Sequence, residues 1–537
     1  MELARLIEAL SEPSAYPCPV KEVEVHHTHI SVVFLAGAYA YKVKKPVELG
    51  FLDFSSLEKR RHFCEEEVRL NRRLAPTVYL AVVPVVNTAT GPKMEGSGEV
   101  IEWAVKMERL PEEATLQKRL RRGEVSAALV VTLAQKIACF HAHAQAGEHI
   151  SAFGRYEVVA RNVRENFDQS APQVGATLSR AVFERLRAVS EQALARHCSL
   201  IETRAGRGVP RDTHGDLHLD HVYLFPERKP PTDLVIIDCI EFNERFRFAD
   251  PVSDMAFLVM DLAFHGRREL ADVFADSYFR DSSDREGRTL LPFYTAYRAA
   301  VRGKVEGFEL VEKEIPEAER SAALARARAH WLLALGELEE PGRKPCLLLV
   351  GGLPGTGKST LALGLAERAD FCLVRSDLVR KQLVGLSARD RARSPFGEGI
   401  YSPAWTERTY AECLRRAEGL LFEGKRVLVD ASFGEEIRRC DFLELAQRLA
   451  VPAVFVLCQA GAEVVRLRLE DRQDDASDAE WSVYRGAAER WEEVGPCSRQ
   501  FLREIPTNGT QEQTLSEAMG MLREFSLLDG TSASSSP

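Results

Sequence analysis

Two short stretches of the chain carry residues whose types and spacing suit phosphate or metal chemistry. GLPGTGKST, from Gly352 to Thr360, places glycines, a lysine and hydroxyls in the spacing G-x-x-x-x-G-K-[ST]. DTHGDLHLDHVYLF, from Asp212 to Phe225, concentrates carboxylates and imidazoles just before an apolar run. The first arrangement is typical of a phosphate cradle, and the second could serve a kinase loop, a metal cluster, or a loop without chemistry.

The phosphate cradle predicts binding of ATP with Mg²⁺. Its glycines let backbone N–H groups wrap the phosphates, Lys358 reaches the β and γ phosphates, and Ser359 offers its hydroxyl to the metal. The apolar run CLLLVGG precedes the motif and the helical run STLALGLAERA follows it, as the motif requires. A glycine-rich turn without a ligand is the alternative. The expected nucleotide-binding residues are Gly352, Gly355, Thr356, Gly357, Lys358, Ser359 and Thr360.

Acidic residues end the next two strand-like runs. FCLVRSDLVRKQL places Asp377 at the end of a strand and Arg380 three residues later. A carboxylate there can accept a hydroxyl proton, and an arginine can hold the acceptor or the transferred phosphate. Asp430 ends RVLVDAS and could organise metal-bound water or the acceptor. The alternatives are an aspartate that caps a helix or a turn and an exposed arginine.

The stretch VVRLRLEDRQDDASDA holds Arg466, Arg468 and Arg472 on a charged helix. In small P-loop kinases such a helix carries a lid whose arginine closes on the γ phosphate. Surface charge in contact with solvent is the alternative for each of the three.

From about Cys346 to Arg523, the series formed by the P-loop, S-D-x-x-R, V-D-A-S and the arginine-rich helix resembles the small P-loop kinases. This family includes 5′-hydroxyl polynucleotide kinases and zeta-toxin-like enzymes. The resemblance implies that Asp377 is the general base, Arg380 an acceptor ligand, and Arg468 or Arg472 the lid arginine. The acceptor itself is not identified by it.

The second stretch, with its surroundings, resembles the aminoglycoside phosphotransferase family over roughly Val25 to Leu262. His214, Gly215 and Asp216 match the family's H-G-D, and IIDCIEF offers Asp238 at the end of the next strand. The nearest likeness is to bacterial proteins that fuse such a domain to a predicted P-loop kinase. The implied roles are phosphate binding by Lys42 or Lys44, orientation of that lysine by Glu67, catalytic base for Asp216, metal ligand for Asp238, and support of the catalytic loop by Asp254.

One position departs from the family pattern, because His221 stands where the family has asparagine. Magnesium prefers oxygen ligands, and a neutral imidazole replaces them poorly. Either His221 still contributes to the metal site, or Asp220 or Glu241 takes over the contact, or this half binds nucleotide weakly and serves as a regulatory or scaffold domain. A dinuclear metal hydrolase is a further interpretation of DLHLDH, but it leaves Lys42 and Glu67 unexplained.

The composition limits the classes of partner and compartment. The 537 residues carry a formal charge of -9, so the summed field opposes a long nucleic acid. Eleven scattered cysteines suit reduced thiols. The N-terminus lacks a signal peptide's apolar core, and no apolar run of about 20 residues could span a bilayer. We expect a cytoplasmic protein that acts on a small-molecule or nucleotide acceptor without a membrane.

Periodicity predicts an α+β, kinase-like bilobal domain over 1–338, a linker over 339–345, an α/β P-loop domain with a parallel sheet over 346–525, and a disordered tail over 526–537. The first domain should open with a hairpin around Gly37 and a helix capped by Ser55 and Glu58. A strand is expected over Asp233 to Phe242. The predicted function is ATP-dependent phosphate transfer to a hydroxyl, and the alternative is a nucleotide-dependent switch or ligand-binding module.

Overall fold

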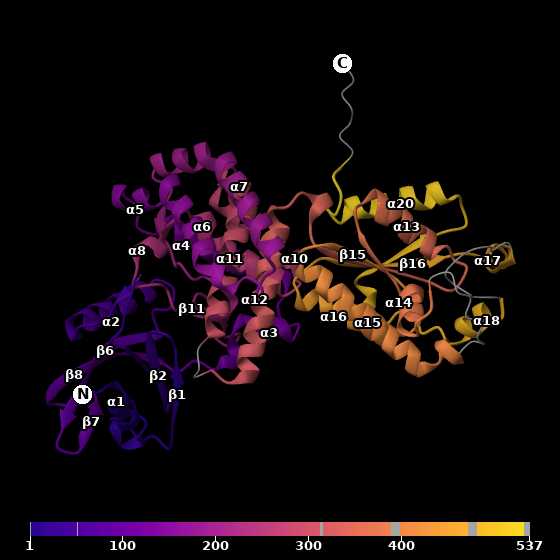
Figure 1. Cartoon of the computed structure of the whole chain (residues 1–537). Helices are drawn as coiled ribbons and strands as arrows, with labels where there is room; N and C mark the ends of the chain where they lie inside the picture. Colours follow the sequence, from indigo (N-terminus) through magenta and orange to yellow (C-terminus); the bar gives the residue numbers. More distant parts are fainter. Residues whose placement is uncertain (1, 51, 312–314, 388–397, 471–480, 531–537) are drawn as a thin grey trace. The chain divides into compact units, whose positions relative to one another are not determined.

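The computed structural model describes residues 2–50, 52–311, 315–387, 398–470 and 481–530. Contacts divide the chain into two compact units (Figure 1). The first comprises 1–161, 197–263 and 267–294, and the second comprises 162–196, 264–266 and 295–537. The second unit therefore reaches back in sequence beyond the expected boundary at 339–345, which stays a prediction.

A six-stranded antiparallel sheet forms the N-terminal part of the first unit, in the order β1-β2-β3-β8-β6-β7. The hairpin expected around Gly37 is present between β2 and β3, and Gly37 has the positive φ of 63° that its turn requires. The helix α2 packs on β6 and β8. The element bounds are α1 Leu3–Leu10, β1 Val23–His27, β2 Ser31–Ala36, β3 Tyr39–Lys44, α2 Leu57–Asn71, β6 Tyr79–Thr88, β7 Gly91–Met94 and β8 Glu99–Glu108.

The cap of α2 differs from the expected one by a single residue. Ser56 is the N-cap, and its hydroxyl accepts a hydrogen bond from the Lys59 N–H at 3.2 Å. The expected capping box of Ser55 with Glu58 is therefore wrong. Asp53 accepts hydrogen bonds from both the backbone N–H and the hydroxyl of Ser55, so Ser55 belongs to the turn that precedes the helix.

Helices make up most of the remaining first unit, and α4 packs against α10. Between these two helices in the sequence, β10 and β11 form a small antiparallel pair. The strand expected over Asp233 to Phe242 is only three residues long, because Asp238 takes a left-handed φ of 65° that ends the extended run. The bounds are α3 Leu116–Arg121, α4 Ala127–His143, α5 Glu148–Phe153, β10 Val222–Leu224, β11 Leu234–Ile236, α9 Pro251–Phe264 and α10 Arg268–Ser282.

Four longer or connecting helices, α6 Tyr156–Ser170, α7 Arg180–Gly206, α11 Leu291–Glu309 and α12 Glu317–Leu338, contribute residues to the second unit. The segment after α12 is held more firmly than its composition suggests. Glu339 is 6% exposed and accepts hydrogen bonds from the Arg185 side chain at 2.9 and 2.7 Å. Arg426 donates to the Pro341 carbonyl at 2.8 Å. Residues of the predicted linker thus make contacts within the second unit.

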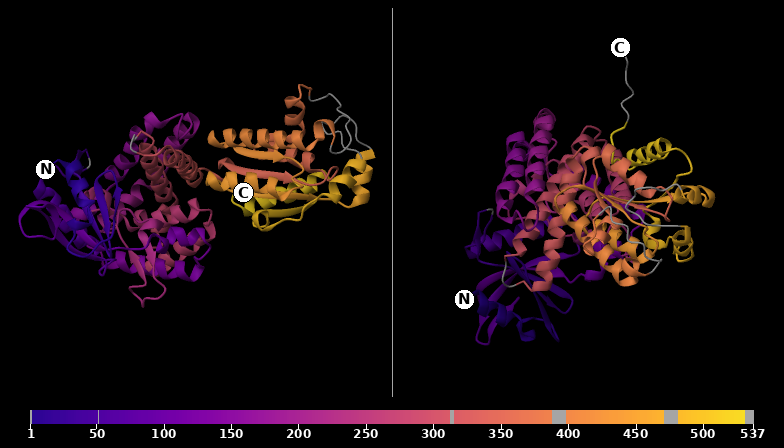
Figure 2. Two further views of the ribbon diagram at one scale, coloured as in Figure 1. Left: turned by 90° about the horizontal axis from the view of Figure 1, so that it is seen from below. Right: turned by 45° about the vertical axis from the view of Figure 1, so that its right-hand side comes forward.

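The C-terminal part of the second unit is a five-stranded parallel sheet in the order β14-β15-β13-β16-β17. Helices α13 and α20 cover one face, and α14, α15 and α16 cover the other (Figures 1 and 2). The strand bounds are β13 Cys346–Gly351, β14 Cys372–Arg375, β15 Arg426–Asp430, β16 Ala453–Gln459 and β17 Leu502–Pro506. The fold class expected for each half of the chain is thus confirmed, and β17 is an additional strand.

The helices around this sheet are α13 Lys358–Arg368, α14 Ser376–Leu383, α15 Pro403–Phe422, α16 Glu436–Arg448, α17 Ala462–Glu470, α18 Trp481–Glu489, α19 Pro496–Arg499 and α20 Gln511–Glu524. Within the described part of the chain, none of the helices combines the length and the apolar character that a membrane crossing needs.

Candidate active sites

The loop between β13 and α13 has the backbone geometry of a phosphate cradle. Gly355 and Gly357 have φ values of 80° and 84°, which other residues adopt at a cost. A side chain on Gly352 would lie 2.7 Å from the Cys458 carbonyl oxygen. Thr507, at the end of β17, donates its hydroxyl to the Thr356 carbonyl at 2.6 Å and so fastens the loop. Thr507 was not predicted from the sequence, because β17 was not expected.

Asp430 lies at the carboxyl end of β15, beside the strand that leads into the cradle. It is 3% exposed, and its Oδ1 has no hydrogen-bond partner. Burial raises the pKa of Asp430, and nearby Lys358 and Ser359 offset that effect only in part. A buried carboxylate oxygen without a donor, close to a serine hydroxyl, is a donor set that fits Mg²⁺. The positions of Asp430 and Ser359 are compatible with the metal role expected of them, which stays a prediction.

Two cavities meet at Lys358. One, of about 550 Å³, is lined by the cradle residues Gly355, Gly357, Ser359 and Thr360 together with Lys358. The other, of about 400 Å³, is lined by Lys358, Asp377 and Arg380, with aromatic walls from Tyr401, Tyr410 and Trp491. Lys358 thus lies in the walls of both cavities, one of them lined by the cradle glycines and the other by Asp377.

Arg380 and Asp377 lie on the first turns of α14 and both line the second cavity. Arg380 is 7% exposed and donates to the Ile400 carbonyl at 2.8 Å and to the Thr406 hydroxyl at 3.3 Å. Its Nε is buried and has no hydrogen-bond partner. An arginine fixed in this way keeps a donor that a ligand in the cavity could satisfy.

Arg468, on α17, lines the first cavity and donates to the Thr507 carbonyl at 2.6 Å. Its Nη1 is buried, has no hydrogen-bond partner, and lies 3.5 Å from the position that a side chain on Gly357 would occupy. The guanidinium therefore stands beside the phosphate cradle. The other candidate lid arginine, Arg472, lies outside the described residues.

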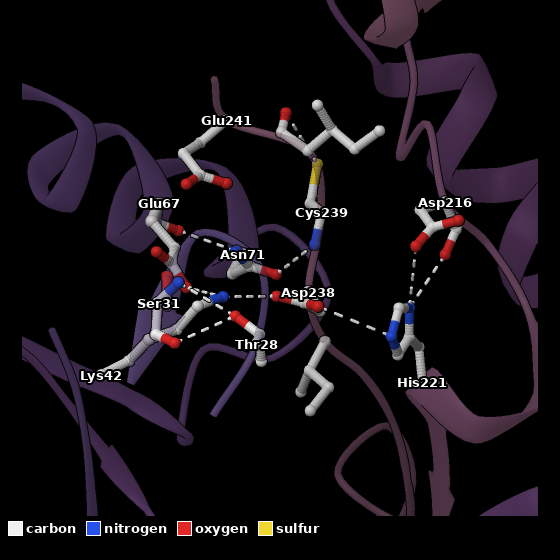
Figure 3. Close-up of polar contacts among 12 residues, drawn as sticks. Thr28, Ser31, Lys42, Glu67, Asn71, Asp216, His221, Asp238, Cys239 and Glu241 are labelled. Carbon is white, nitrogen blue, oxygen red and sulfur yellow. Dashed lines mark hydrogen bonds and ion pairs between the residues drawn. The ribbon is translucent and has the colours of Figure 1, made fainter. Parts of the chain in front are cut away.

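In the first unit, Lys42 and Lys44 of β3 meet Glu67 of α2 and two carboxylates, Asp238 and Glu241, of the loop after β11. Figure 3 shows Lys42 beside Glu67 and Asp238. Lys42 pairs with Glu67 of α2 at 2.9 Å and with Asp238 at 2.8 Å. Lys44 pairs with the other oxygen of Glu67 at 2.7 Å and with Glu241. The sequence left Lys42 and Lys44 as alternatives. The structure brings both to Glu67 and places Lys42 beside the expected metal ligand, whereas Lys44 is fully buried.

The electrostatics of this cluster are those of paired buried charges. Burial by itself would raise the pKa of Glu67, but Lys42 and Lys44 together hold it below its ordinary value. Partial removal of the Asp238 side chain from water would likewise raise its pKa, and Lys42 and His221 hold that pKa well below its usual range. Glu67 and Asp238 are therefore carboxylates in the folded protein, each stabilised by cationic or polar neighbours.

Asn71 and Tyr79 position Asp238 and were missed by the sequence argument. The Asn71 side chain accepts from the Cys239 N–H at 2.9 Å, and the Tyr79 hydroxyl accepts from the Asp238 N–H at 3.2 Å. Asn71 lies four residues after Glu67 on the same helix face. This four-residue spacing is the sequence signal from which Asn71 could have been predicted to lie near Glu67.

The loop from His214 to Asp216 is supported as expected by Asp254. Its two carboxylate oxygens accept from the backbone N–H groups of His214 and Gly215 at 3.1 and 2.8 Å. His141 of α4 joins this support, with Nε2 3.0 Å from Asp254 and Nδ1 2.8 Å from the Tyr278 hydroxyl. Burial lowers the pKa of His214 to about 4, so this ring is neutral near pH 7.

Histidines surround Asp216. His218 lies between two carboxylates, with Nε2 3.2 Å from Asp216 and Nδ1 against Asp220. The His221 ring packs on that of His218, with centroids 3.9 Å apart, and its Nε2 is 3.5 Å from Asp238 (Figure 3). Asp216, His218 and His221 offer ligand atoms within 4.8 Å of one another. The chemistry of this donor set is nitrogen-rich and does not fit Mg²⁺ well.

The carboxylates considered as replacements for the family's asparagine have other partners. Glu241 is paired with Lys44, and Asp220 is paired with His218. The hydrolase interpretation is also not favoured, since the loop leads to Asp238 and the lysine cluster in the arrangement that the kinase resemblance implies.

Comparisons with known proteins match the two halves separately and the whole chain together. Residues 51–291 match the model of the phosphotransferase enzyme family, and residues 347–493 match the model of an AAA domain. Uncharacterized proteins of Mycobacterium tuberculosis strain H37Rv and of Mycobacterium bovis are each 32% identical over 501 residues, which is 93% of this chain and 95% of the relative.

Among solved structures, the GDP complex of aminoglycoside 2′-phosphotransferase-IIIa is 14% identical, with a TM-score of 0.38 over 62% of this chain and 99% of that chain. A gluconokinase from Sinorhizobium meliloti 1021 is 17% identical, with a TM-score of 0.26 over 34% of this chain and 95% of that chain.

Proposed function

The chain belongs to the family of these mycobacterial relatives and is an ATP-dependent kinase, with a phosphotransferase segment followed by a P-loop segment. We propose that its P-loop site moves the γ phosphate of ATP to a hydroxyl. The acceptor is a small molecule or a nucleotide end. The observation that carries the proposal is the position of Lys358 in the walls of both cavities, between the phosphate cradle and Asp377.

Residues of the chain account for each part of an in-line transfer. The acceptor oxygen attacks the γ phosphorus while the bond to the ADP oxygen breaks, and Asp377 takes the hydroxyl proton. Lys358 and the cradle N–H groups hold the phosphates, and Arg468 stands beside the cradle to meet charge that develops on the transferred group. Bound at Ser359 and Asp430, Mg²⁺ would supply neutralisation of phosphate charge.

Arg380 favours a substrate that carries a hydrogen-bond-accepting or anionic group beside the hydroxyl to be phosphorylated. The Nε of Arg380 is buried and has no hydrogen-bond partner. A substrate that accepts a hydrogen bond from this Nε should therefore bind more tightly than a substrate that leaves it unpaired. The aromatic residues Tyr401, Tyr410 and Trp491 give the same cavity apolar walls. A small phosphorylated or carboxylated alcohol and a nucleotide end both meet these requirements, whereas a long polyanion is opposed by the net charge.

The alternative of a nucleotide-dependent switch is not favoured by a phosphotransferase family match over 51–291. The N-terminal site is a possible second phosphotransferase site, with Asp216 as base and Lys42 on the nucleotide.

The proposal is tested with Asp377→Asn in the full chain. Libraries of phosphorylated sugars, hydroxy acids and nucleotides are screened for acceptor-stimulated ADP formation and for a mass gain of one phosphate group. With the acceptor found, Asp377→Asn should lower transfer by about two to four orders of magnitude and leave ATP affinity nearly unchanged. The exposed Asp370→Asn is the matched control. An equal loss of ATP binding in Asp377→Asn would contradict its role as base.

A further inference from the structure

His221 and Asp238 face each other in a way that a hydrogen bond does not explain. The His221 Nδ1 lies 2.9 Å from the Asp216 carbonyl oxygen. A carbonyl can only accept, so this contact requires the proton on Nδ1. In the neutral ring, Nε2 then carries a lone pair, and it points at a carboxylate oxygen of Asp238 3.5 Å away. With the ring neutral, two electron-pair donors thus face each other across this gap, whereas a protonated ring would make the contact an ion pair.

Another histidine paired with a carboxylate in the first unit shows the difference. His149 Nε2 lies 2.9 Å from Glu244, a normal hydrogen-bond distance at the surface. The separation of 3.5 Å between His221 and Asp238 is longer than a hydrogen bond. It is close to the roughly 3.4 Å that separates two ligands held at about 2.1 Å from one tetrahedral metal ion.

Of the two histidines that pack together, His218 and His221, it is His221 that directs a ring nitrogen at Asp238 Oδ2. Both nitrogens of His218 face carboxylates, those of Asp216 and Asp220. Lys42 touches Asp238 through Oδ1, whereas His221 faces Oδ2, so the two contacts use different oxygens. The side chain of Asp238 is 42% exposed and that of His221 16% exposed, so an ion can reach the pair from solvent.

We propose that the N-terminal site binds a first-row transition-metal ion of the zinc class, with His221 Nε2 and Asp238 Oδ2 as ligands, in preference to Mg²⁺. Imidazole with carboxylate suits Zn²⁺ and Co²⁺, whereas Mg²⁺ selects oxygen donors. The Nδ1 hydrogen bond to the Asp216 carbonyl fixes the tautomer and aims the ring, as a supporting contact does in known metal sites. This assignment concerns the N-terminal site and does not depend on phosphate transfer at the P-loop.

The test measures metal binding directly on the full chain, with no activity required. Equilibrium dialysis and visible absorption follow Co²⁺, whose bands between about 500 and 650 nm report nitrogen and oxygen ligands, and Zn²⁺ and Mg²⁺ serve as competitors. In the wild type, Zn²⁺ should displace Co²⁺ from this site, and a thousandfold excess of Mg²⁺ should not. Retention of Co²⁺ under that excess supports the proposal even without a variant, and its loss overturns it.

Variants then locate the site. His221→Asn should weaken Co²⁺ binding at least tenfold and strengthen that of Mg²⁺, because an amide oxygen replaces the imidazole nitrogen. Asp238→Asn should weaken both, and His149→Asn, which removes the surface pair, should change neither. Circular dichroism checks folding, and His221→Gln replaces His221→Asn if that variant fails to fold. Equal Co²⁺ affinity in the wild type and in His221→Asn would overturn the assignment and leave His221 as an imidazolium paired with Asp238.

Discussion

The essential lysines of the two candidate sites stand in opposite surroundings. Lys358 lies between two cavities, and buried groups near it, Asp430 Oδ1 and Arg468 Nη1, have no hydrogen-bond partner. Lys42 is paired with Glu67 and Asp238, and Lys44 beside it is paired with Glu67 and Glu241. Unsatisfied buried groups are costly unless a ligand completes them. The P-loop site thus keeps buried polar groups that a ligand could satisfy, whereas the lysines of the N-terminal site are already paired with carboxylates.

This difference has a consequence for ligand binding. A nucleotide that enters the P-loop site can bind to buried groups that the fold has already removed from water. The free energy of these interactions is therefore not reduced by the cost of desolvating those groups. A nucleotide entering the N-terminal site must share Lys42 with Glu67 and Asp238, whose carboxylates already neutralise its charge. We therefore expect the P-loop site to dominate ATP turnover, and the following predictions test that ranking.

The largest effect is expected for Lys358→Ala. Because the cradle loses the charge that contacts the β and γ phosphates, ADP formation by the full chain should fall by about three orders of magnitude. The exposed Lys425→Ala is the matched control. Unchanged turnover in Lys358→Ala would reverse the ranking and place the activity in the N-terminal site.

Asp216→Asn sharpens the comparison when made in the Lys358→Ala background. Any residual ADP formation should then fall by about two to four orders of magnitude, since a general base has been removed. The assay is run with Mg²⁺ and with Zn²⁺, and Asp276→Asn, at a surface ion pair with Arg288, is the control. Residual turnover that survives Asp216→Asn would come from elsewhere and contradict the assigned base.

Glu67→Gln tests whether the N-terminal cluster is held by its internal pairing. Removing the shared carboxylate leaves Lys42 and Lys44 with less compensation in a buried site, and we expect a loss of about 3 kcal/mol in the free energy of unfolding. Urea and thermal unfolding measure it. Glu66→Gln, one residue earlier on α2 and paired with Arg69 near the surface, should cost under about 1 kcal/mol. Equal losses of unfolding free energy in the two variants would show that the ion pairs of Glu67 stabilise the protein no more than a surface ion pair does.

The last prediction concerns pH. Burial lowers the pKa of His214 to about 4, against about 6.5 in an unfolded chain. Between these values the unfolded chain binds a proton that the folded ring excludes, so stability falls as the pH falls from about 6.5 to 4. The complete loss from this group is roughly 3 kcal/mol. His214→Gln should flatten the pH dependence of the melting temperature over this window, and the exposed His27→Gln should not.

Elements that depend on neighbouring residues could be predicted from the sequence. The hairpin around Gly37, the helix of Glu67 and the strand, loop and helix around Gly352 follow from turn, capping and periodicity signals within a few residues. Errors arose where one residue decided the backbone. Asp53 drew Ser55 into the turn, and the left-handed Asp238 cut short a strand that its apolar composition favoured.

By itself the sequence determined the phosphate cradle, because the glycines, the lysine and the hydroxyls of a P-loop are consecutive and the loop's conformation follows from them. Only the tertiary structure decided how Lys42, Lys44, Glu67, Asp238 and Glu241 are shared among ion pairs, since Lys42 and Asp238 are 196 positions apart. It also decided that His221 faces Asp238 rather than solvent. Such contacts depend on how the sheet, α2 and the catalytic loop pack together, and no local pattern of residues encodes the distance between two side chains on different elements.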